Sequence, residues 1–324
     1  MGINNKKLVL AIVGMLLLPI AGCGNDQAGG NGSEAKPVAK MEVPARAEVA
    51  TAPTEVFKFG DHEGKVYELT GVDLQKLIRT GKIVTLGQEI FFHTDSAGEA
   101  DKHQHMRKVT MKGETITDLT DLGQSGDIAS LATNGKVVVW PSADSKLAIY
   151  DGTDVKIGDK WRGLMAGDAE SGEFYRMRGG TFELVKLENG EQKETRTVVE
   201  DMRKQPGFEK AGLSPICVDN GEWYLRYVIR ENDKDQHYLL ALDKDGKELR
   251  RYEGLTELPR GWAVTANYVI HACSKGELRI FDKATGQIIA DTKINLRPFA
   301  LWTITGNDVI LYDDRADKLY RIDF

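Results

Sequence analysis

A single thiol near the start of the chain is the side chain with the clearest chemistry. Cys23 follows the small residues Ala21 and Gly22, and these follow an apolar run that ends at Ile20. Small side chains let an extended segment enter a peptidase cleft, and a thiol is a nucleophile that can accept a diacylglycerol group. Cys23 is therefore a candidate for covalent attachment of a lipid.

The residues before Cys23 are typical of an export signal. Lys6 and Lys7 place positive charge at the start, where it stays on the cytoplasmic side. The apolar stretch from Leu8 to Ile20 is too short to span a bilayer as a stable helix, which takes roughly 20 residues. The polar, glycine-rich residues that follow also argue against a retained membrane helix.

The motif Ile20-Ala21-Gly22-Cys23 resembles the lipobox of bacterial lipoproteins, with Ile20 at the position where leucine is usual. The resemblance implies that residues 1–22 are a lipoprotein signal peptide and that Cys23 carries acyl chains such as palmitate. It also implies an extracytoplasmic protein anchored to a bacterial cell membrane, inner or outer. An ordinary secretory signal with an incidental cysteine is the alternative.

The charge of the chain restricts its partners. The formal net charge is −6, and removal of residues 1–22, whose only charged side chains are Lys6 and Lys7, leaves −8. An acidic protein is not built to hold nucleic acid or an anionic membrane surface. We therefore predict no nucleic-acid partner and attachment to the membrane through the lipid.

Composition divides the mature chain into a tether and one domain. Gly24 to Thr54, 31 residues without an aromatic side chain, cannot bury enough apolar surface to offset the entropy of ordering. A flexible coil of that length spans roughly 30 Å. Phe57 and Phe59 mark the start of a globular domain, so we expect the lipidated cysteine and tether at 23–54 and one domain at 55–324.

Two kinds of β-hairpin alternate along this domain. One kind is centred on turns such as Asn134-Gly135 and Asn220-Gly221, a strong hairpin signal. The other kind ends in a turn that contains a glycine, and these glycines fall at 113, 152, 190, 246 and 286, with spacings of 39, 38, 56 and 40. Four strands in about 40 residues is the period of a β-propeller.

We predict an all-β, six-bladed β-propeller with four-stranded blades. The six units span about 80–119, 126–158, 162–201, 212–254, 259–293 and 298–324. The last unit lacks its outer strand, which either Val56–Phe59 or Lys65–Leu69 could supply, so that an N-terminal strand closes the ring. A β-sandwich, a β-barrel, or a propeller of five or seven blades is the alternative.

The second hairpin resembles the repeats of quinoprotein-like and WD40-like bacterial propellers, which carry an Ala-x-Asp-x-x-Thr-Gly pattern. The best match is Phe281-Asp282-Lys283-Ala284-Thr285-Gly286, although Ala290 stands where a tryptophan is usual. The resemblance implies a propeller and does not imply an activity.

Arginine and aromatic residues recur in the loops that lead into the first strand of each unit, here called the lead-in loops. The candidates for ligand or partner binding are Arg79, Trp161, Arg162, Arg203, Arg260, Trp262 and Arg297. Guanidinium groups gathered at one mouth of the channel would suit an anionic ligand or an acidic segment of a partner. In the alternative, each arginine braces its own loop and the tryptophans fill gaps between blades.

Other chemistry has weaker support. His103 and His105 could bind a divalent metal together with Asp101 or Glu99, but such pairs are common in solvated loops, so no metal is predicted. No catalytic motif stands out and no cofactor is expected. Cys217 and Cys273 are either two buried thiols, which we favour, or a disulfide.

These observations favour a binding or scaffold protein of the bacterial cell envelope. It would recognise a protein or an envelope polymer through one face of the propeller. One alternative is a propeller hydrolase or lyase that acts on a peptide or sugar in the central channel, so enzymatic activity is left open. The other is a sensor of a small anionic ligand.

Overall fold

Strands account for nearly all regular structure in this computed structural model. It describes residues 48–49, 52–70, 83–87, 89–95, 104–110, 117–123, 131–141, 146–188, 191–205, 208, 212–231, 234–256, 259–303, 307–313, 315–316 and 318–324. The chain divides into two units, Met1–Pro37 and Val38–Phe324, and all described residues belong to the second. The predicted signal peptide, Cys23 and most of the predicted tether lie outside the described residues. Of the helices within these ranges, none has the length and apolarity needed to cross a membrane.

Six antiparallel sheets follow one another along the chain. Blade 1 contains β4 (Ile83–Leu86), β5 (Glu89–Asp95), β6 (Gln104–Thr110) and β7 (Thr117–Gly123). Blade 2 contains β8 (Ala132–Thr133), β9 (Val138–Pro141), β10 (Lys146–Tyr150) and β11 (Val155–Lys160). Blade 3 contains β12 (Leu164–Gly167), β13 (Phe174–Arg178), β14 (Thr181–Glu188) and β15 (Glu191–Val199). A short 3₁₀ helix, η3 (Met202–Lys204), follows it.

Blades 4 to 6 complete the ring. Blade 4 contains β16 (Gly212–Asp219), β17 (Glu222–Glu231), β18 (Lys234–Leu242) and β19 (Glu248–Glu253). Blade 5 contains β20 (Pro259–Val264), β21 (Tyr268–Cys273), β22 (Glu277–Asp282) and β23 (Ile288–Lys293). Blade 6 contains β24 (Pro298–Thr303), β25 (Asp308–Asp313) and β26 (Lys318–Asp323), together with the N-terminal strands β1 (Glu48–Val49), β2 (Glu55–Phe59) and β3 (His62–Thr70).

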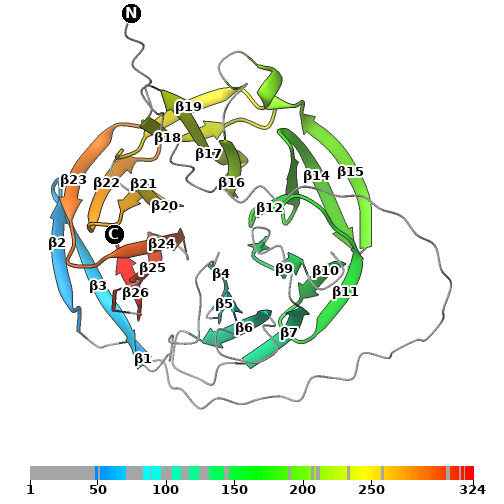
Figure 1. The fold of residues 1–324 in the computed structure, drawn as a ribbon, viewed down its shortest axis with the longest axis horizontal. Coiled ribbons are helices and arrows are strands. Elements are labelled where there is room, and N and C mark those ends of the chain that lie inside the picture. Colours follow the sequence, from blue (N-terminus) through cyan, green and yellow to red (C-terminus); the bar gives the residue numbers. More distant parts are fainter. Residues whose placement is uncertain are drawn as a thin grey trace, which may run out of the picture. The chain divides into compact units, whose positions relative to one another are not determined.

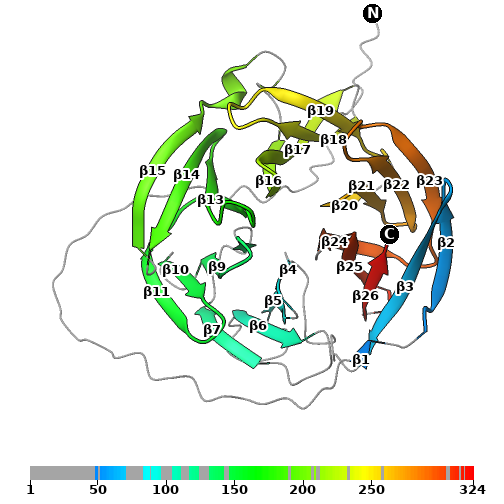
Figure 2. The ribbon, with the colours of Figure 1, turned by 180° about the vertical axis from the view of Figure 1, so that it is seen from behind.

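The predicted fold class is confirmed. The six sheets succeed one another around a ring, each with its first strand innermost (Figure 1), and the reverse view shows the same order (Figure 2). The all-β six-bladed propeller with four-stranded blades is thus correct, and the β-sandwich and β-barrel alternatives are wrong. The strands also begin and end close to the predicted limits of the six units.

The turns between strands define two faces of the propeller. Because each blade is antiparallel, its first and third turns lie on one face, here called the turn face. The second turn and the lead-in loop lie on the opposite face, here called the lead-in face. On the turn face, Asn220 and Gly221 both have positive φ, 50° and 72°, as a two-residue hairpin turn requires. The turn after Asp282 instead relies on Gly286, whose φ is 76°.

The fourth strand of blade 6 comes from the N-terminal side of the domain. β3 pairs with β26 in antiparallel register, with Val66 opposite Ile322, and β2 pairs with the outer side of β3. Phe57 and Phe59 of β2 are buried in a cluster of blade 5 and blade 6 residues. The ring of Phe59 meets the ring of Tyr268 edge-on at 5.4 Å. The β2–β3 hairpin therefore packs across the junction of blades 5 and 6.

Buried histidines occupy the junction of blades 4 and 5. His271 of β21 is fully buried, its ring centroid is 4.2 Å from that of Trp262, and its Nδ1 accepts a hydrogen bond from the backbone of Leu255. Burial, together with the nearby charges of His237 and Arg226, lowers the pKa of His271 to about 3. Burial also lowers the pKa of His237. Cys217 and Cys273 are both free thiols in the described structure.

Truncation of Phe59 should destabilise the domain strongly. Phe59 is 1% exposed, and a Phe→Ala change in a core costs about 3–5 kcal/mol because contacts are lost and a cavity opens. Val56 on the same strand is 49% exposed, so Val56→Ala should change the free energy of unfolding by less than about 0.5 kcal/mol. Urea denaturation measures both values, and equal effects would show that β2 is not docked as described.

Stability should also fall in mild acid through His271. Its pKa in the folded state lies below the unfolded value, so only the unfolded state binds a proton as the pH falls below about 6.5. Between about pH 7 and pH 5 this lowers the free energy of unfolding by about 2 kcal/mol. His271→Gln, which keeps an acceptor for Leu255, should remove most of that loss. Thermal melts at both pH values measure it, with His62→Gln, an exposed site, as the control.

Candidate functional site

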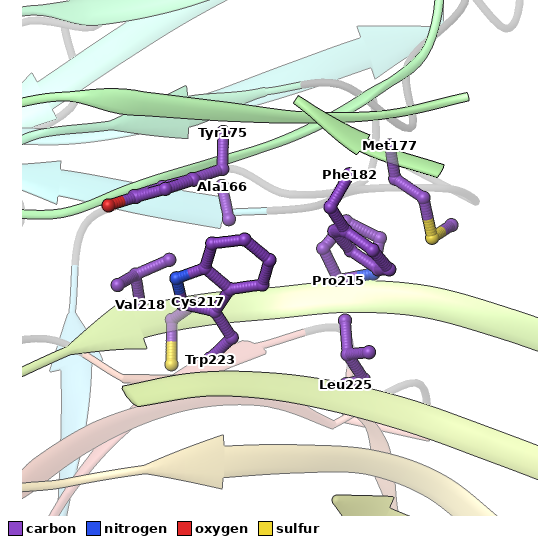
Figure 3. A pocket seen from close by; sticks show the side chains of 9 residues that line it. All are labelled: Ala166, Tyr175, Met177, Phe182, Pro215, Cys217, Val218, Trp223 and Leu225. Atoms are coloured by element: carbon purple, nitrogen blue, oxygen red, sulfur yellow. The ribbon is translucent and has the colours of Figure 1, made fainter. Parts of the chain in front are cut away.

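The first cavity to consider is a small apolar pocket between blades 3 and 4. It is lined by Ala166, Tyr175, Met177, Phe182, Pro215, Cys217, Val218, Trp223 and Leu225 (Figure 3). Its centre is the indole of Trp223, whose ring centroid lies 4.8 Å from that of Tyr175 and 5.4 Å from that of Phe182. The free volume is about 10 Å³, no more than a water molecule needs. This pocket is a packing gap and not a ligand site.

A larger, open hollow lies on the turn face. Its volume is about 550 Å³. The lining residues come from blade 4, blade 5 and the tip of the β2–β3 hairpin, and they are His62, Asn220, Glu222, Arg250, Ala266, Asn267, Tyr268, Asp282, Lys283, Ala284 and Ile289. Binding pockets for small molecules are usually about 300–1,000 Å³. The hollow, here called the turn-face hollow, is therefore the candidate site.

Lys283 joins the turns of the two blades beneath the hollow. Its ammonium forms an ion pair with Asp219 of blade 4 and donates hydrogen bonds to the carbonyls of Thr265, at 2.9 Å, and Ala266, at 3.3 Å. Its side chain is 10% exposed. An ammonium has three donors, and each donor of Lys283 has an acceptor, so these contacts fix the position of the side chain.

A second network surrounds Glu222 and Arg250 in blade 4. These two form an ion pair, and Oε2 of Glu222 also accepts from the hydroxyl of Tyr224 at 2.8 Å. Nε of Arg250 donates to the hydroxyl of Tyr252 at 3.1 Å, and that hydroxyl donates to the carbonyl of Lys283 at 2.7 Å. The polar groups at the floor of the hollow therefore form one chain of contacts from blade 4 to blade 5.

The pKa values of Tyr224, Tyr252 and Arg250 are all raised. Burial raises the pKa of Tyr224, and its hydrogen bond to Glu222 adds to the effect. Burial also raises the pKa of Tyr252. For Arg250, burial opposes the charge, but hydrogen bonds to Glu222 and Tyr252 outweigh it and raise the pKa. Both hydroxyls are neutral donors, and the arginine is a permanent cation.

The rim of the hollow presents polar groups and ring edges. Asn220 and Asn267 are exposed at the two turns. His62 is also exposed, and its ring stacks on Phe59 at 5.4 Å and lies 6.0 Å from the ring of Tyr268. Asp282 accepts from the backbone and hydroxyl of Thr285, which lowers the pKa of its carboxyl. The rim thus combines amides, a carboxylate and aromatic edges.

The two tryptophans predicted to bind a ligand are buried. Trp161 is 3% exposed; its indole donates to the carbonyl of Gly163 at 3.2 Å, and the guanidinium of Arg176 lies 4.8 Å from its ring centroid. Trp262 is 4% exposed and packs between blades 4 and 5. Both side chains therefore contribute to the contacts between blades.

Arg203 contacts its own loop. Its guanidinium donates two hydrogen bonds to the carboxylate of Asp201, at 2.9 and 2.8 Å, and lies over the glycine turn at residues 179–180. The Arg203 guanidinium lowers the pKa of Asp201 to about 2. Local pairing leaves the guanidinium about half exposed on the lead-in face.

The other predicted residues lie on separate blades. Arg162 and Arg297 are exposed at the starts of blades 3 and 6, whereas Arg260 is half-buried in β20. Arg79 and His103 lie outside the described residues, and His105 lies in β6. In the part of the chain that the structure describes, no three histidine, cysteine, aspartate or glutamate residues are grouped to hold a metal ion.

The residues of the turn-face hollow were missed as site residues, although their turns were identified. Asn220-Gly221 and Asp282–Gly286 are among the hairpin signals of the sequence. The contact between Lys283 and Asp219 depends on the fold, because the two residues are 64 positions apart in the sequence. A lysine inside an otherwise regular turn motif is the one signal that could have identified the contact.

Comparisons with known proteins give structural similarities only. No family model and no curated protein matches the chain. Similar solved structures include BamB from Moraxella catarrhalis, with 13% identity over 89% of this chain and 99% of that chain and a TM-score of 0.48. The WD40 β-propeller domain of Doa1 has 16% identity, coverages of 88% and 97%, and a TM-score of 0.46. The computationally designed protein Ika8 has 13% identity, coverages of 88% and 100%, and a TM-score of 0.42. At such identities and TM-scores, these similarities establish nothing about what this chain binds.

Proposed function

We propose that this protein is a lipid-anchored, extracytoplasmic binding or scaffold module of the bacterial cell envelope. It recognises a protein or an envelope polymer through one face of its propeller. The observation that carries this proposal is the turn-face hollow, an open concavity of about 550 Å³ built from two blades and the N-terminal hairpin. The lipobox-like motif that ends at Cys23 supports the location and the anchor.

The path of the chain supports an orientation for the hollow. β2 begins at Glu55, opposite Val66, and reaches the turn face at Phe59, opposite His62. β1 pairs with the other end of β3, at Leu69 and Thr70. The chain thus enters the domain at the lead-in face, and the hollow opens on the far side. With Cys23 lipidated, we expect the hollow to point away from the membrane that holds the protein.

The state of the carboxylates favours binding over hydrolysis. Glu222 is paired with Arg250 and accepts from Tyr224, and Asp282 caps its own turn with a lowered pKa. A general acid needs a carboxyl whose pKa is raised toward the working pH, usually by burial or a like charge. The pKa of Asp282 is lowered instead, and Glu222 is engaged in an ion pair, so both carboxylates are suited to accept hydrogen bonds from a ligand.

The lead-in face is a second surface for the same function. Arg162 and Arg297 are exposed there, and exposed guanidinium groups can bind an acidic partner or a small anionic ligand. The predicted role of the lead-in arginines therefore stays a proposal. It is separable from the turn-face hollow because the two faces can be altered independently.

The lipid anchor is tested by Cys23→Ala. The wild-type chain should fractionate with membranes and incorporate an alkyne-bearing palmitate analogue. Cys23→Ala should incorporate none and appear in the soluble fraction. The membrane-bound fraction should fall at least about tenfold, because two or three acyl chains hold a protein essentially permanently. Cys217→Ala is the control, because it removes a cysteine without touching the motif. Membrane retention and labelling of Cys23→Ala would contradict the assignment.

The binding face is tested by retention on isolated cell envelopes. The soluble Cys23→Ala chain should sediment with them, and adding Asn220→Gly with Asn267→Ala should reduce retention at least about fivefold by removing contacts at the hollow. Glycine suits position 220 because φ is positive there. Lys244→Ala, an exposed change in a neighbouring turn, should leave retention unchanged.

Charge reversal on the other face completes this experiment. If Arg162→Glu with Arg297→Glu abolishes retention and the double asparagine variant does not, the lead-in face is the binding surface. If the Cys23→Ala chain is not retained by envelopes at all, the proposed binding function is wrong.

A further inference from the structure

We propose that the turn-face hollow binds a saccharide, and specifically an acetamido sugar of an envelope glycan. This inference rests on the proposed binding function and specifies the ligand of the same site. Three properties of the lining residues carry it: their balanced charge, their mixture of donors and acceptors, and their small apolar groups beside ring edges.

Charge balance is the first property. The lining holds two cations, Arg250 and Lys283, and two carboxylates, Glu222 and Asp282. Arg250 pairs with Glu222, and Lys283 pairs with Asp219 just outside the lining. Asp282 accepts from the backbone and hydroxyl of Thr285 in its own turn. An anionic ligand would have to compete with Glu222 and Asp219 for the two cations. A cationic ligand would have to compete with those cations for Glu222 and Asp219, or with the turn hydrogen bonds of Thr285 for Asp282. Removing the partner of a largely buried charge is strongly unfavourable. The hollow therefore favours a neutral, polar ligand.

The hydrogen-bonding groups are the second property. Carboxylate oxygens of Glu222 and Asp282 accept only, the guanidinium of Arg250 donates only, and the amides of Asn220 and Asn267 do both. A hydroxyl group both donates and accepts. A ligand rich in hydroxyls can satisfy this mixture without disturbing the ion pairs, whereas an apolar ligand would leave the polar groups unpaired.

The apolar part of the lining is the third property. Ala266, Ala284 and Ile289 bring methyl groups to the hollow, and Tyr268 and His62 bring ring edges. The C–H face of a sugar ring can pack against such groups, and the methyl of an acetamido substituent can pack beside the alanines while its amide pairs with an asparagine. A sugar that has hydroxyls alone would use only part of this surface.

Titration calorimetry with three defined probes tests the inference. The probes are the tetramer of N-acetylglucosamine, maltotetraose, and a charge-balanced tetrapeptide of alanine, glutamate, lysine and alanine. We expect the N-acetylglucosamine tetramer to bind the Cys23→Ala chain at least about tenfold more tightly than the other two probes. Its Kd should change less than about twofold between about 50 and 500 mM NaCl, because screening affects charged ligands most. A Kd that rises about tenfold or more over that range would contradict a neutral site.

Variants locate the binding and separate the two proposals. Asn220→Gly combined with Asn267→Ala should weaken binding of the tetramer at least about tenfold, whereas Lys244→Ala should leave the binding unchanged. If the tetramer fails to bind while envelope retention persists and depends on the two asparagines, the saccharide inference is wrong and the binding function stands. Tighter binding of the tetrapeptide than of the tetramer, with the same dependence on the asparagines, also overturns the inference and assigns the hollow to a peptide. If retention itself is absent, the failure lies in the proposed function.

Discussion

The antiparallel pairing of β3 with β26 is the constraint on which the rest of this structure depends. The C-terminal segment supplies only three strands of the last blade, β24, β25 and β26. Without a partner, β26 would leave a row of unpaired backbone N–H and C=O groups at the edge of the sheet. β3 satisfies that edge although roughly 250 residues of chain separate the two strands. β2 then packs Phe57 and Phe59 against blade 5, so apolar burial supports the hydrogen bonds. The same hairpin carries His62 to the wall of the hollow, so one side of the site depends on this pairing.

Polar contacts between blades 4 and 5 fix the floor of the hollow. A buried ammonium or guanidinium gains little net stability from a partner, because removing both charges from water costs about as much as their attraction returns. What such a network provides is a defined geometry, since every donor of Lys283 has one acceptor and any shift of the blades breaks several bonds together. The floor is therefore rigid, while the exposed amides above it can adjust to a ligand.

The sequence predicts the architecture better than the site for a physical reason. Turn chemistry is local, so Asn220-Gly221 and the aspartate–glycine turns reveal the strands and the period of about 40 residues. Burial of an aromatic residue is not local, so the sequence left open whether Trp161 and Trp262 bind a ligand or fill gaps between blades, and in the structure both indoles are buried between blades. Arg203 is intermediate, because Asp201 stands two residues away and the pairing could be anticipated. The contact of Lys283 with Asp219 requires two blades to be side by side, which no turn motif encodes.

The β2–β3 hairpin lies between the predicted lipid anchor and the hollow, so its direction affects how the domain resists a force that pulls the two apart. β2 and β3 run between the two faces, with Glu55 at the lead-in face and His62 beside the hollow. The carboxylate of Glu55 accepts from the backbone and side chain of Asn295, and the hydroxyl of Thr292 donates to the carbonyl of Lys58. Under the proposed function, a pull between the lipid and a ligand in the hollow runs lengthwise along these strands. Their hydrogen bonds then share the load together, whereas a pull at right angles to β2 would break them one after another. An anchor at one face and a binding site at the other thus suit a hairpin that spans the depth of the domain.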